Sequence, residues 1–352
     1  MKITDQERVV LGYEGNKLIS YCASLCYKSE PKKSDYDFVQ MLMNNKHYAM
    51  LEHSVYCFKT PVSFAQKYAL VFLPYLPYMK ISCKTERENR FCFASINLRT
   101  ILEMMEGNST AFCIGYSLFN KIKESTPLPK NISEKIEARK EFFNNIDAKF
   151  GKDISIIVPR DYFSENSIHY YTHVFASVYF KTNRGVANEI VRHRASFAQV
   201  STRYVDYTKR GEHIPFILRN DFKEKFSDLI GKTFESKDLV DIAKRSKGTT
   251  FYNWIMACCT CEEDYKEARA QGDLAQMARD VLNLSLETEL VMTANLLQWI
   301  HFTNLREKGT TGKPHPEMLE LTKGFCQQLS EDYNCSLDIP DDFRGSGKVL
   351  MY

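Results

Sequence analysis

The sequence predicts a mixed protein of the α/β class, of the α+β type, because strand and helix patterns both recur along its 352 residues. Residues 174–180 form a short apolar run that favours a strand. Asn183-Arg184-Gly185 interrupts the run, and apolar residues then return at helical spacing over 186–191. We therefore expect a strand followed closely by a helix in the middle of the chain.

A second helix is expected to run from Asn295 to Arg306. Asn295 suits the N-cap, where its side-chain oxygen accepts a hydrogen bond from the backbone of the first turn. The two residues are eleven positions apart, which is about three helical turns and roughly 16 Å, so both are expected on one face. A lone histidine such as His301, between Trp299 and Phe302, is by itself more typical of a protein core than of a ligand site.

Other segments give weaker indications. The prolines at 127 and 129 indicate an exposed connection. The charged run over 135–140 supports this connection, and a polar helix is expected to follow. The other expected elements are a strand over 91–96, a helix over 97–105, one or two surface helices over 219–247, and a loose tail over 340–352.

Composition limits the function classes. Hydrophobic residues make up 44% and charged residues 26%, as in soluble globular proteins, and a net charge of +3 is too small for general nucleic-acid binding. Eleven cysteines without a secretory leader indicate a reducing compartment, so we expect a cytoplasmic protein. No apolar run reaches the length of a membrane span, and no membrane partner is expected.

Three familiar motifs are absent or incomplete. Cys258-Cys259-Thr260-Cys261 has a Cys-x-x-Cys spacing, but it has no second pair and lies in an apolar, helical stretch, so no metal is expected. The chain has no Gly-x-Gly-x-x-Gly, which argues against a Rossmann-type dinucleotide site. Gly309 to Lys313 has the wrong spacing for a phosphate-binding loop, and we expect a flexible loop that places His315.

The most informative segment is Arg192 to Tyr204, which carries three arginines in thirteen residues. A guanidinium is planar, stays charged and matches phosphate geometry, and arginines this close repel one another unless an anion lies between them. Arg192, His193 and Arg194 are expected at a helix C-terminus. Ser201 and Arg203 are two apart, so in an extended segment both would point to one side. The segment therefore predicts one concave cationic surface that binds a phosphorylated ligand.

This segment resembles the signature of the flavin-dependent thymidylate synthases, in which an Arg-His-Arg run is followed by a Ser and an Arg-Tyr pair. Six residues separate Arg194 from Ser201 where the family usually has seven. The resemblance extends to other pieces of the chain. His47 to Ser54 is similar to the family's His-x(4)-Glu-His segment, Ala278-Arg279 to its Ala-Arg pair, and residues 295–306 with 315–317 to the last part of its site.

The resemblance implies a central, mostly antiparallel sheet flanked by helices, in a single domain over 1–352 with an insertion at about 61–171. It implies reductive methylation of dUMP to dTMP, with 5,10-methylenetetrahydrofolate as carbon donor and FAD reduced by NADPH. No catalytic cysteine is required. The family assembles as a homotetramer whose sites combine several subunits, so we expect the same here, with small molecules and not nucleic acid as further partners.

The resemblance also assigns residues. It gives catalysis to Arg306 and Ser201, because a cation against a ring carbonyl stabilises the charge that builds up on the pyrimidine. The residues expected against the nucleotide are Arg192, Glu189, Gln199, Ser201, Thr202, Arg203, Arg279 and Arg306. The residues expected against flavin and folate are His47, Glu52, Arg192, His193, Arg194, Asn295, His301 and His315. Three positions depart from the family: Glu189 replaces a frequent Gln, Gln199 a common acidic residue, and Ala198 an Asn.

Two alternatives come from other classes. A histidine phosphatase uses an Arg-His-Gly run, but here Arg194 replaces the glycine and the run follows a helix late in the chain. A non-catalytic RNA-binding module would use arginines and aromatic residues to hold single strands, with steep salt dependence.

Overall fold

The computed structural model describes residues 1–30, 32–209, 213–238, 242, 246 and 248–338. The tail expected over 340–352 lies outside the described residues, as does part of the segment 219–247. Within the described residues, no helix combines the length and apolar character that crossing a membrane requires.

The central sheet has the strand order β2-β7-β10-β8, and every neighbouring pair is antiparallel. Its long middle pair, β7 (Phe175–Asn183) and β10 (Glu287–Asn295), is in register from end to end. The edge strands are β2 (Glu7–Leu11) and β8 (Ser196–Gln199). The strand expected over 174–180 is confirmed, and so is the α+β class with antiparallel sheets flanked by helices.

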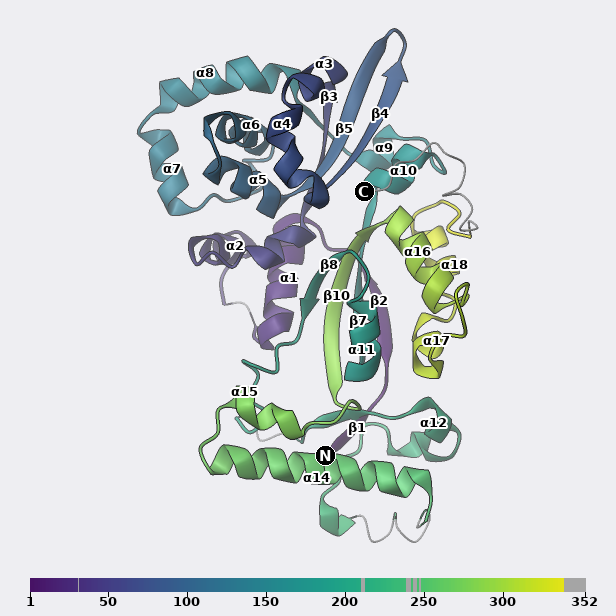
Figure 1. Ribbon diagram of the computed structural model, residues 1–352. Helices are drawn as coiled ribbons and strands as arrows, with labels where there is room; N and C mark the ends of the chain where they lie inside the picture. Colours follow the sequence, from purple (N-terminus) through teal and green to yellow (C-terminus); the bar gives the residue numbers. More distant parts are fainter. Residues whose placement is uncertain (31, 210–212, 239–241, 243–245, 247, 339–352) are drawn as a thin grey trace.

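Helices cover both faces of this sheet (Figure 1). The larger core packs β7 and β10 against the helices on one face, with Trp299, Phe302 and Phe325 fully buried. On the other face α1 (Gly15–Tyr27) packs against Ala198 and Val291. The helices around the first core are α10 (Ile168–His173), α11 (Arg184–Ile190), α16 (Leu296–Arg306), α17 (Pro316–Thr322) and α18 (Phe325–Asp332).

A second antiparallel sheet occupies much of the expected insertion, in the order β4-β5-β3-β6. Its strands are β3 (Val55–Pro61), β4 (Met79–Glu86), β5 (Asn89–Asn97) and β6 (Ser155–Ile157). It has its own core with α5 (Leu98–Glu106), α6 (Ser109–Asn120), α7 (Lys130–Glu137) and α8 (Lys140–Phe150). The expectation of one sheet was therefore incomplete, because the inserted residues pair among themselves and with β3.

A third layer lies at the opposite end of the molecule in Figure 1. Here β1 (Lys2–Thr4) pairs in parallel with β9 (Pro215–Ile217), and both pack against α14 (Thr250–Ala270), whose Cys258 and Cys259 are buried as small apolar residues. The surface-helix prediction over 219–247 is met in part by α12 (Asn220–Phe226). The other short helices are α2 (Asp35–Asn44), η1 (Tyr48–His53), α3 (Val62–Lys67), α4 (Ala69–Phe72), η2 (Leu73–Tyr78), η3 (Gly151–Asp153), α9 (Pro159–Tyr162), η4 (Ser227–Leu229), η5 (Ser236–Asp238), α15 (Ala275–Ala278) and η6 (Arg279–Val281).

Candidate functional site

The Arg-His-Arg run lies where the sequence predicts, directly after the C-terminus of α11 and before β8. Asn183 caps the start of α11 by accepting from the backbone of Val186 (2.8 Å). Arg192 and Arg194 are exposed. Within the part of the chain that the structure describes, neither guanidinium has a carboxylate within 4.0 Å. Both charges are therefore available to an external anion.

His193 forms a compact polar cluster with Arg306 and Glu189. Arg306 Nε donates to His193 Nε2 (3.1 Å), Nη1 donates to Glu189 Oε2 (2.8 Å), and Nη2 donates to the Glu189 carbonyl (3.0 Å). Burial and then the charge of Arg306 lower the pKa of His193 to about 4. His193 is therefore neutral near pH 7, with Nε2 as an acceptor. Arg306 keeps two of its five N–H donors for another partner.

A second cluster gathers at Thr202, which is 5% exposed. Its hydroxyl accepts from Arg279 Nη1 (3.2 Å) and, at 3.5 Å, from Arg184 Nη1. Arg203 is exposed and donates from Nε to Gln276 (3.2 Å). No described carboxylate lies within 4.0 Å of Arg184, Arg203 or Arg279. Two cations thus border one buried hydroxyl, and a third, Arg203, belongs to the next residue of the chain, so the cluster could hold an anion.

Sequence reasoning missed Arg184 in this cluster. We treated Asn183-Arg184-Gly185 only as an interruption between strand and helix, although a cation in the first turn of α11 is unfavourable against the helix dipole. A cation that opposes the helix dipole at this position is a sequence signal that the side chain has a role outside the helix, such as ligand binding.

The predicted single cationic surface is divided in the structure. Arg184 begins α11 and Glu189 is next to its last residue, so about 7.5 Å of helix rise separates the backbone positions from which the two clusters are reached. The segment after β8 is also a turn and not an extended strand: the backbone N–H groups of Tyr204 and Val205 donate to the Ser201 carbonyl (3.1 and 2.9 Å). The prediction that Ser201 and Arg203 share one side of an extended segment was wrong, because this chain turns directly after its short edge strand.

The other nucleotide candidates border the Thr202 cluster. The Ser201 backbone is fixed by its N–H, which donates to the Cys26 carbonyl (3.0 Å). Gln199 Nε2 donates to Thr288 Oγ1 (3.3 Å). Tyr204 is 58% exposed, and its ring lies 5.4 Å from that of Tyr27. The two rings are tilted by 52°, and the Arg203 guanidinium lies 5.3 Å from the centre of the Tyr204 ring.

The segment expected to hold flavin begins with an exposed His47 at the start of η1. Glu52 pairs with Arg99 (2.7 Å), and its carbonyl accepts from Ser196 Oγ (3.4 Å), so η1 is joined to β8. The next residue, His53, is part of the predicted His-x(4)-Glu-His segment, but no contact of its own was predicted for it. It is buried, it bonds Thr293 through Nδ1 (2.7 Å), and burial lowers its pKa to about 4.

The last three candidates are Asn295, His301 and His315, and they differ in whether the fold already uses their side chains. Asn295 is 2% exposed, caps α16 as predicted and donates to the Thr172 carbonyl (2.9 Å), so its amide is used within the fold. His301 lies with its ring 5.7 Å from that of His193. His315 caps α17, and together with Glu189 it lines a cavity of 610 Å³. His301 therefore lies beside His193 and His315 lines the cavity beside Glu189, whereas the Asn295 side chain is committed to the fold.

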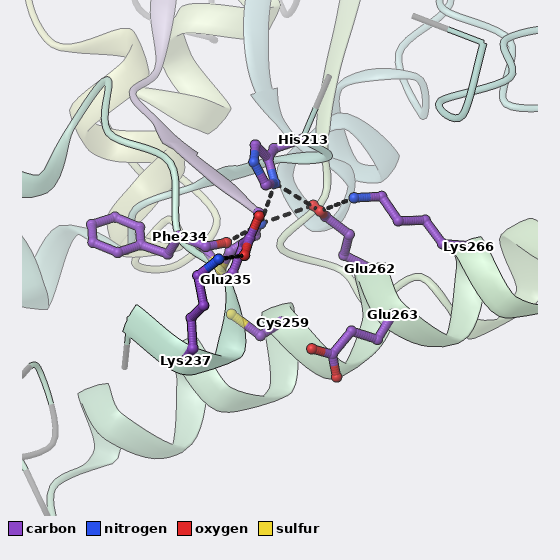
Figure 2. Close-up of a pocket in the computed structure, with 9 residues that line it drawn as sticks. His213, Phe234, Glu235, Lys237, Cys259, Glu262, Glu263 and Lys266 are labelled. Atoms are coloured by element: carbon purple, nitrogen blue, oxygen red, sulfur yellow. Dashed lines mark hydrogen bonds and ion pairs between the residues drawn. The ribbon is translucent and has the colours of Figure 1, made fainter. Parts of the chain in front are cut away.

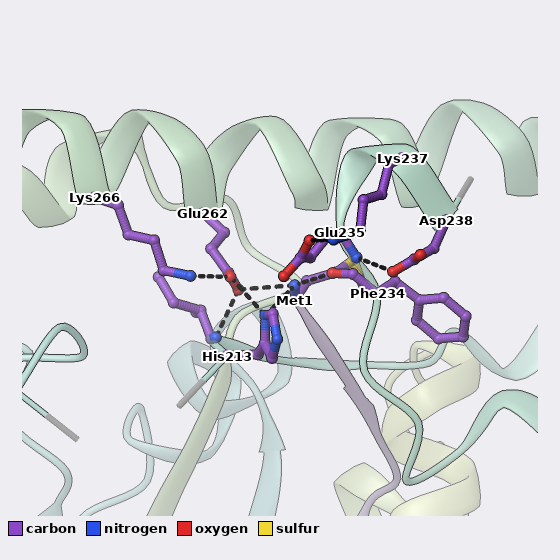
Figure 3. A network of polar contacts seen from close by, with 9 residues as sticks. Met1, His213, Phe234, Glu235, Lys237, Asp238, Glu262 and Lys266 are labelled. Atoms are coloured by element: carbon purple, nitrogen blue, oxygen red, sulfur yellow. Dashed lines mark hydrogen bonds and ion pairs between the residues drawn. The ribbon is translucent and has the colours of Figure 1, made fainter. Parts of the chain in front are cut away.

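A smaller cavity of 290 Å³ lies against α14, in the third layer (Figure 2). Its polar groups already bond one another. Glu262 accepts from the Ile214 backbone N–H (2.7 Å), from Lys266 (2.5 Å) and from the amino group of Met1 (2.9 Å), with His213 alongside (Figure 3). This network holds β1 and β9 to α14. In the described part of the chain, no three His, Cys, Asp or Glu residues cluster as a metal site.

Comparison with known proteins gives a family match. A family model described as "Thymidylate synthase complementing protein" matches residues 162–332, beginning within the last part of the expected insertion. A probable flavin-dependent thymidylate synthase of Paramecium bursaria Chlorella virus 1 is 27% identical over 42% of this chain and 64% of its own. The flavin-dependent thymidylate synthase of Synechocystis is 29% identical, over 39% of this chain and 59% of its own. That of Corynebacterium diphtheriae is 30% identical, over 38% of this chain and 50% of its own. The matches thus span about half to two thirds of these relatives.

Solved structures were compared as well. The UMP/dUMP methylase PolB from Streptomyces cacaoi, bound with 5-Br dUMP, aligns over 94% of this chain and 93% of its own, with 11% identity and a TM-score of 0.37.

Proposed function

We propose that this protein methylates dUMP to dTMP, because residues 162–332 match the thymidylate synthase complementing family and the chain is similar to flavin-dependent thymidylate synthases. We propose 5,10-methylenetetrahydrofolate as the carbon donor, FAD as the cofactor and NADPH as its reductant. The observation that carries the proposal is the Arg192–Tyr204 segment. It has the family's residues in the family's order, and its Thr202 accepts from Arg184 and Arg279, neither of which has a described carboxylate partner.

The Thr202 cluster suits the nucleotide phosphate. Arg203 and Arg279 offer planar forks of donors, and Thr202 and Ser201 offer hydroxyl groups. A phosphate dianion there would take the Arg279 donor that now reaches Thr202 and would relieve the repulsion among the cations. We propose that Gln199, on β8, contacts the nucleoside in place of its bond to Thr288.

Arg306 suits the pyrimidine ring. Glu189 and His193 hold its guanidinium from one side and leave two donors, as a group that must meet a ring carbonyl in a fixed orientation requires. Negative charge that builds up on the ring during carbon transfer would be stabilised by this cation. Because Glu189 also fixes Arg306, its carboxylate sets the direction in which the remaining donors point.

The residues assigned to flavin fit an anionic, aromatic cofactor. Arg192 and Arg194 present exposed charges that suit a pyrophosphate, and His193 and His301 present ring faces nearby. Once reduced by NADPH, the flavin would supply the electron pair that completes the methyl group. His47, Glu52 and His315 lie on other elements, and we propose that a homotetramer brings some of them to the site from a neighbouring subunit.

The test is a titration of purified protein reconstituted with FAD. Adding dUMP is expected to perturb the flavin absorption spectrum, and adding UMP at equal concentration serves as the matched comparison. A protein that binds no FAD, or whose bound FAD is unaffected by any pyrimidine nucleotide, would contradict the proposal.

A further inference from the structure

Cys83 and Cys92 lie directly opposite each other on β4 and β5. They are register partners in this antiparallel pair, and their sulfur atoms are 3.4 Å apart. Partners in antiparallel strands have Cα atoms about 4.5 to 5.5 Å apart, which lies within the range that a disulfide accepts, about 4.4 to 6.8 Å. The backbone therefore needs no rearrangement to join them.

The two thiols differ in access. All eleven cysteines of the chain lie in the described residues, and among them Cys83 alone is exposed. Cys92 is buried and lines a small apolar cavity of 50 Å³ with Phe58 and Met79. Burial and the contact with Cys83 raise the pKa of Cys92 to about 12. An external reagent thus meets Cys83 first, and Cys92 can react only with the sulfur in front of it.

We propose that Cys83 and Cys92 form a reversible dithiol site that reacts with low-molecular-weight disulfides. The Cys83 thiolate attacks one sulfur of the oxidant RSSR, and RS⁻ leaves with the electron pair of the broken bond. The Cys92 sulfur then loses its proton to solvent and attacks Cys83, which releases a second RS⁻. The two cysteines are oxidised to one disulfide, and RSSR is reduced to two RSH.

The disulfide would fix a surface ribbon. β4 and β5 extend beyond the neighbouring helices at one end of the molecule in Figure 1, and the turn between them follows Glu86. A bond between Cys83 and Cys92 closes this turn and sets the register of the pair, because a slip of one residue would move Cys83 to the other face. Amide hydrogen exchange in residues 83–92 is therefore expected to slow on oxidation.

The experiment treats the full-length protein with oxidised glutathione and measures intact mass and peptide maps. Wild type is expected to lose two hydrogen atoms, to hold no glutathione at completion and to yield a peptide joined through Cys83 and Cys92. Dithiothreitol should reverse the change. Cys92→Ser should retain one glutathionyl group on Cys83, whereas Cys83→Ser should leave Cys92 unmodified. Cys113→Ser, at a half-buried cysteine of another element, should behave as wild type.

The proposal is overturned if wild type keeps both thiols, if glutathione stays on Cys83, or if the bond joins another pair. If circular dichroism shows that Cys92→Ser does not fold, Cys92→Ala serves instead, because it also leaves the glutathionyl group on Cys83. Because dUMP methylation is assayed separately, a negative result here leaves the proposed function intact, and failure of that function leaves this test unchanged.

Discussion

Arg306 Nη1 lies 2.8 Å from Glu189 Oε2, and the same guanidinium donates from Nε to His193. The pair joins the end of α16 to the end of α11, next to the Arg-His-Arg run. Because both side chains are partly buried, the ion pair is less screened than a surface pair and holds Arg306 in one orientation.

Replacing Arg306 with Ala is expected to lower kcat for dUMP methylation by roughly 100-fold or more, because a preorganised charge against the ring is lost. FAD should remain bound, as measured by its absorbance after gel filtration. Arg306→Lys should recover only part of the rate, since an ammonium lacks the planar fork that Glu189 and His193 hold. Lys140→Ala, at an exposed pair on α8, is the control. Normal turnover of Arg306→Ala would contradict the assigned role.

Replacing Arg184 with Leu is expected to raise KM for dUMP about tenfold and to change kcat much less. The variant would lose a contact to the phosphate of bound dUMP beside Thr202, which weakens substrate binding and not the chemical step. A tenfold change corresponds to about 1.4 kcal/mol of binding free energy. Arg184→Lys should recover part of the affinity, and Lys232→Ala, at an exposed pair, should resemble wild type. If Arg184→Leu leaves KM unchanged while stability falls, the residue has only a structural role.

Acid is expected to destabilise the fold through buried histidines. Burial lowers the pKa of His53 to about 4, of His173 to about 3 and of His193 to about 4, against about 6.5 when unfolded. The unfolded chain binds more protons, so the free energy of unfolding falls as pH drops from about 6.5 to about 4, by up to about 1.4 kcal/mol per pH unit for each histidine. Carboxylates such as Asp206, with a pKa lowered to about 2, act at lower pH.

Urea unfolding at several pH values between 7 and 4.5 measures this slope. His53→Gln removes one titrating group and should make the dependence shallower, although the variant is less stable at pH 7 because Thr293 loses one of its two partners and keeps only Ser177. A stability that does not change over this range would contradict the assigned protonation states.

Asn295→Ala is expected to destabilise the protein by about 1 to 3 kcal/mol, because α16 loses its cap and the buried Thr172 carbonyl loses a donor. Asn295→Asp keeps the capping oxygen but buries a carboxylate oxygen against the Thr172 carbonyl, so its loss should be at least as large. FAD affinity of the folded variants should be unchanged, as measured by fluorescence titration. A selective loss of FAD binding without loss of stability would restore Asn295 to the cofactor site.

The sequence predicted those parts of the structure that local chemistry determines. The strand at β7, the helix α16 with its Asn295 cap and the position of Arg192 after α11 follow from apolar spacing and capping preferences. The arrangement within the site did not follow. That Arg306 meets Glu189 while Arg279 meets Thr202 depends on how α11, α16 and η6 pack, which spacing alone does not encode.

The second sheet was missed for a related reason. Strand β5 was expected over 91–96, but its pairing with β3 and β4 joins segments from inside and outside the insertion. Such nonlocal pairing has no local sequence signal. Arg184 was missed because its neighbours Asn183 and Gly185 indicated a turn, and no role was predicted for the charged side chain between them.

The most direct test of the central claim is a product assay. Purified protein is incubated with dUMP, FAD, NADPH and methylenetetrahydrofolate labelled with ¹³C in its one-carbon unit. The nucleotides are then separated, and their masses are measured by mass spectrometry. The account predicts that dTMP with one labelled methyl group forms only when FAD is present. It also predicts that dUMP stimulates the oxidation of NADPH. Unchanged dUMP, with FAD bound and all substrates present, would contradict it.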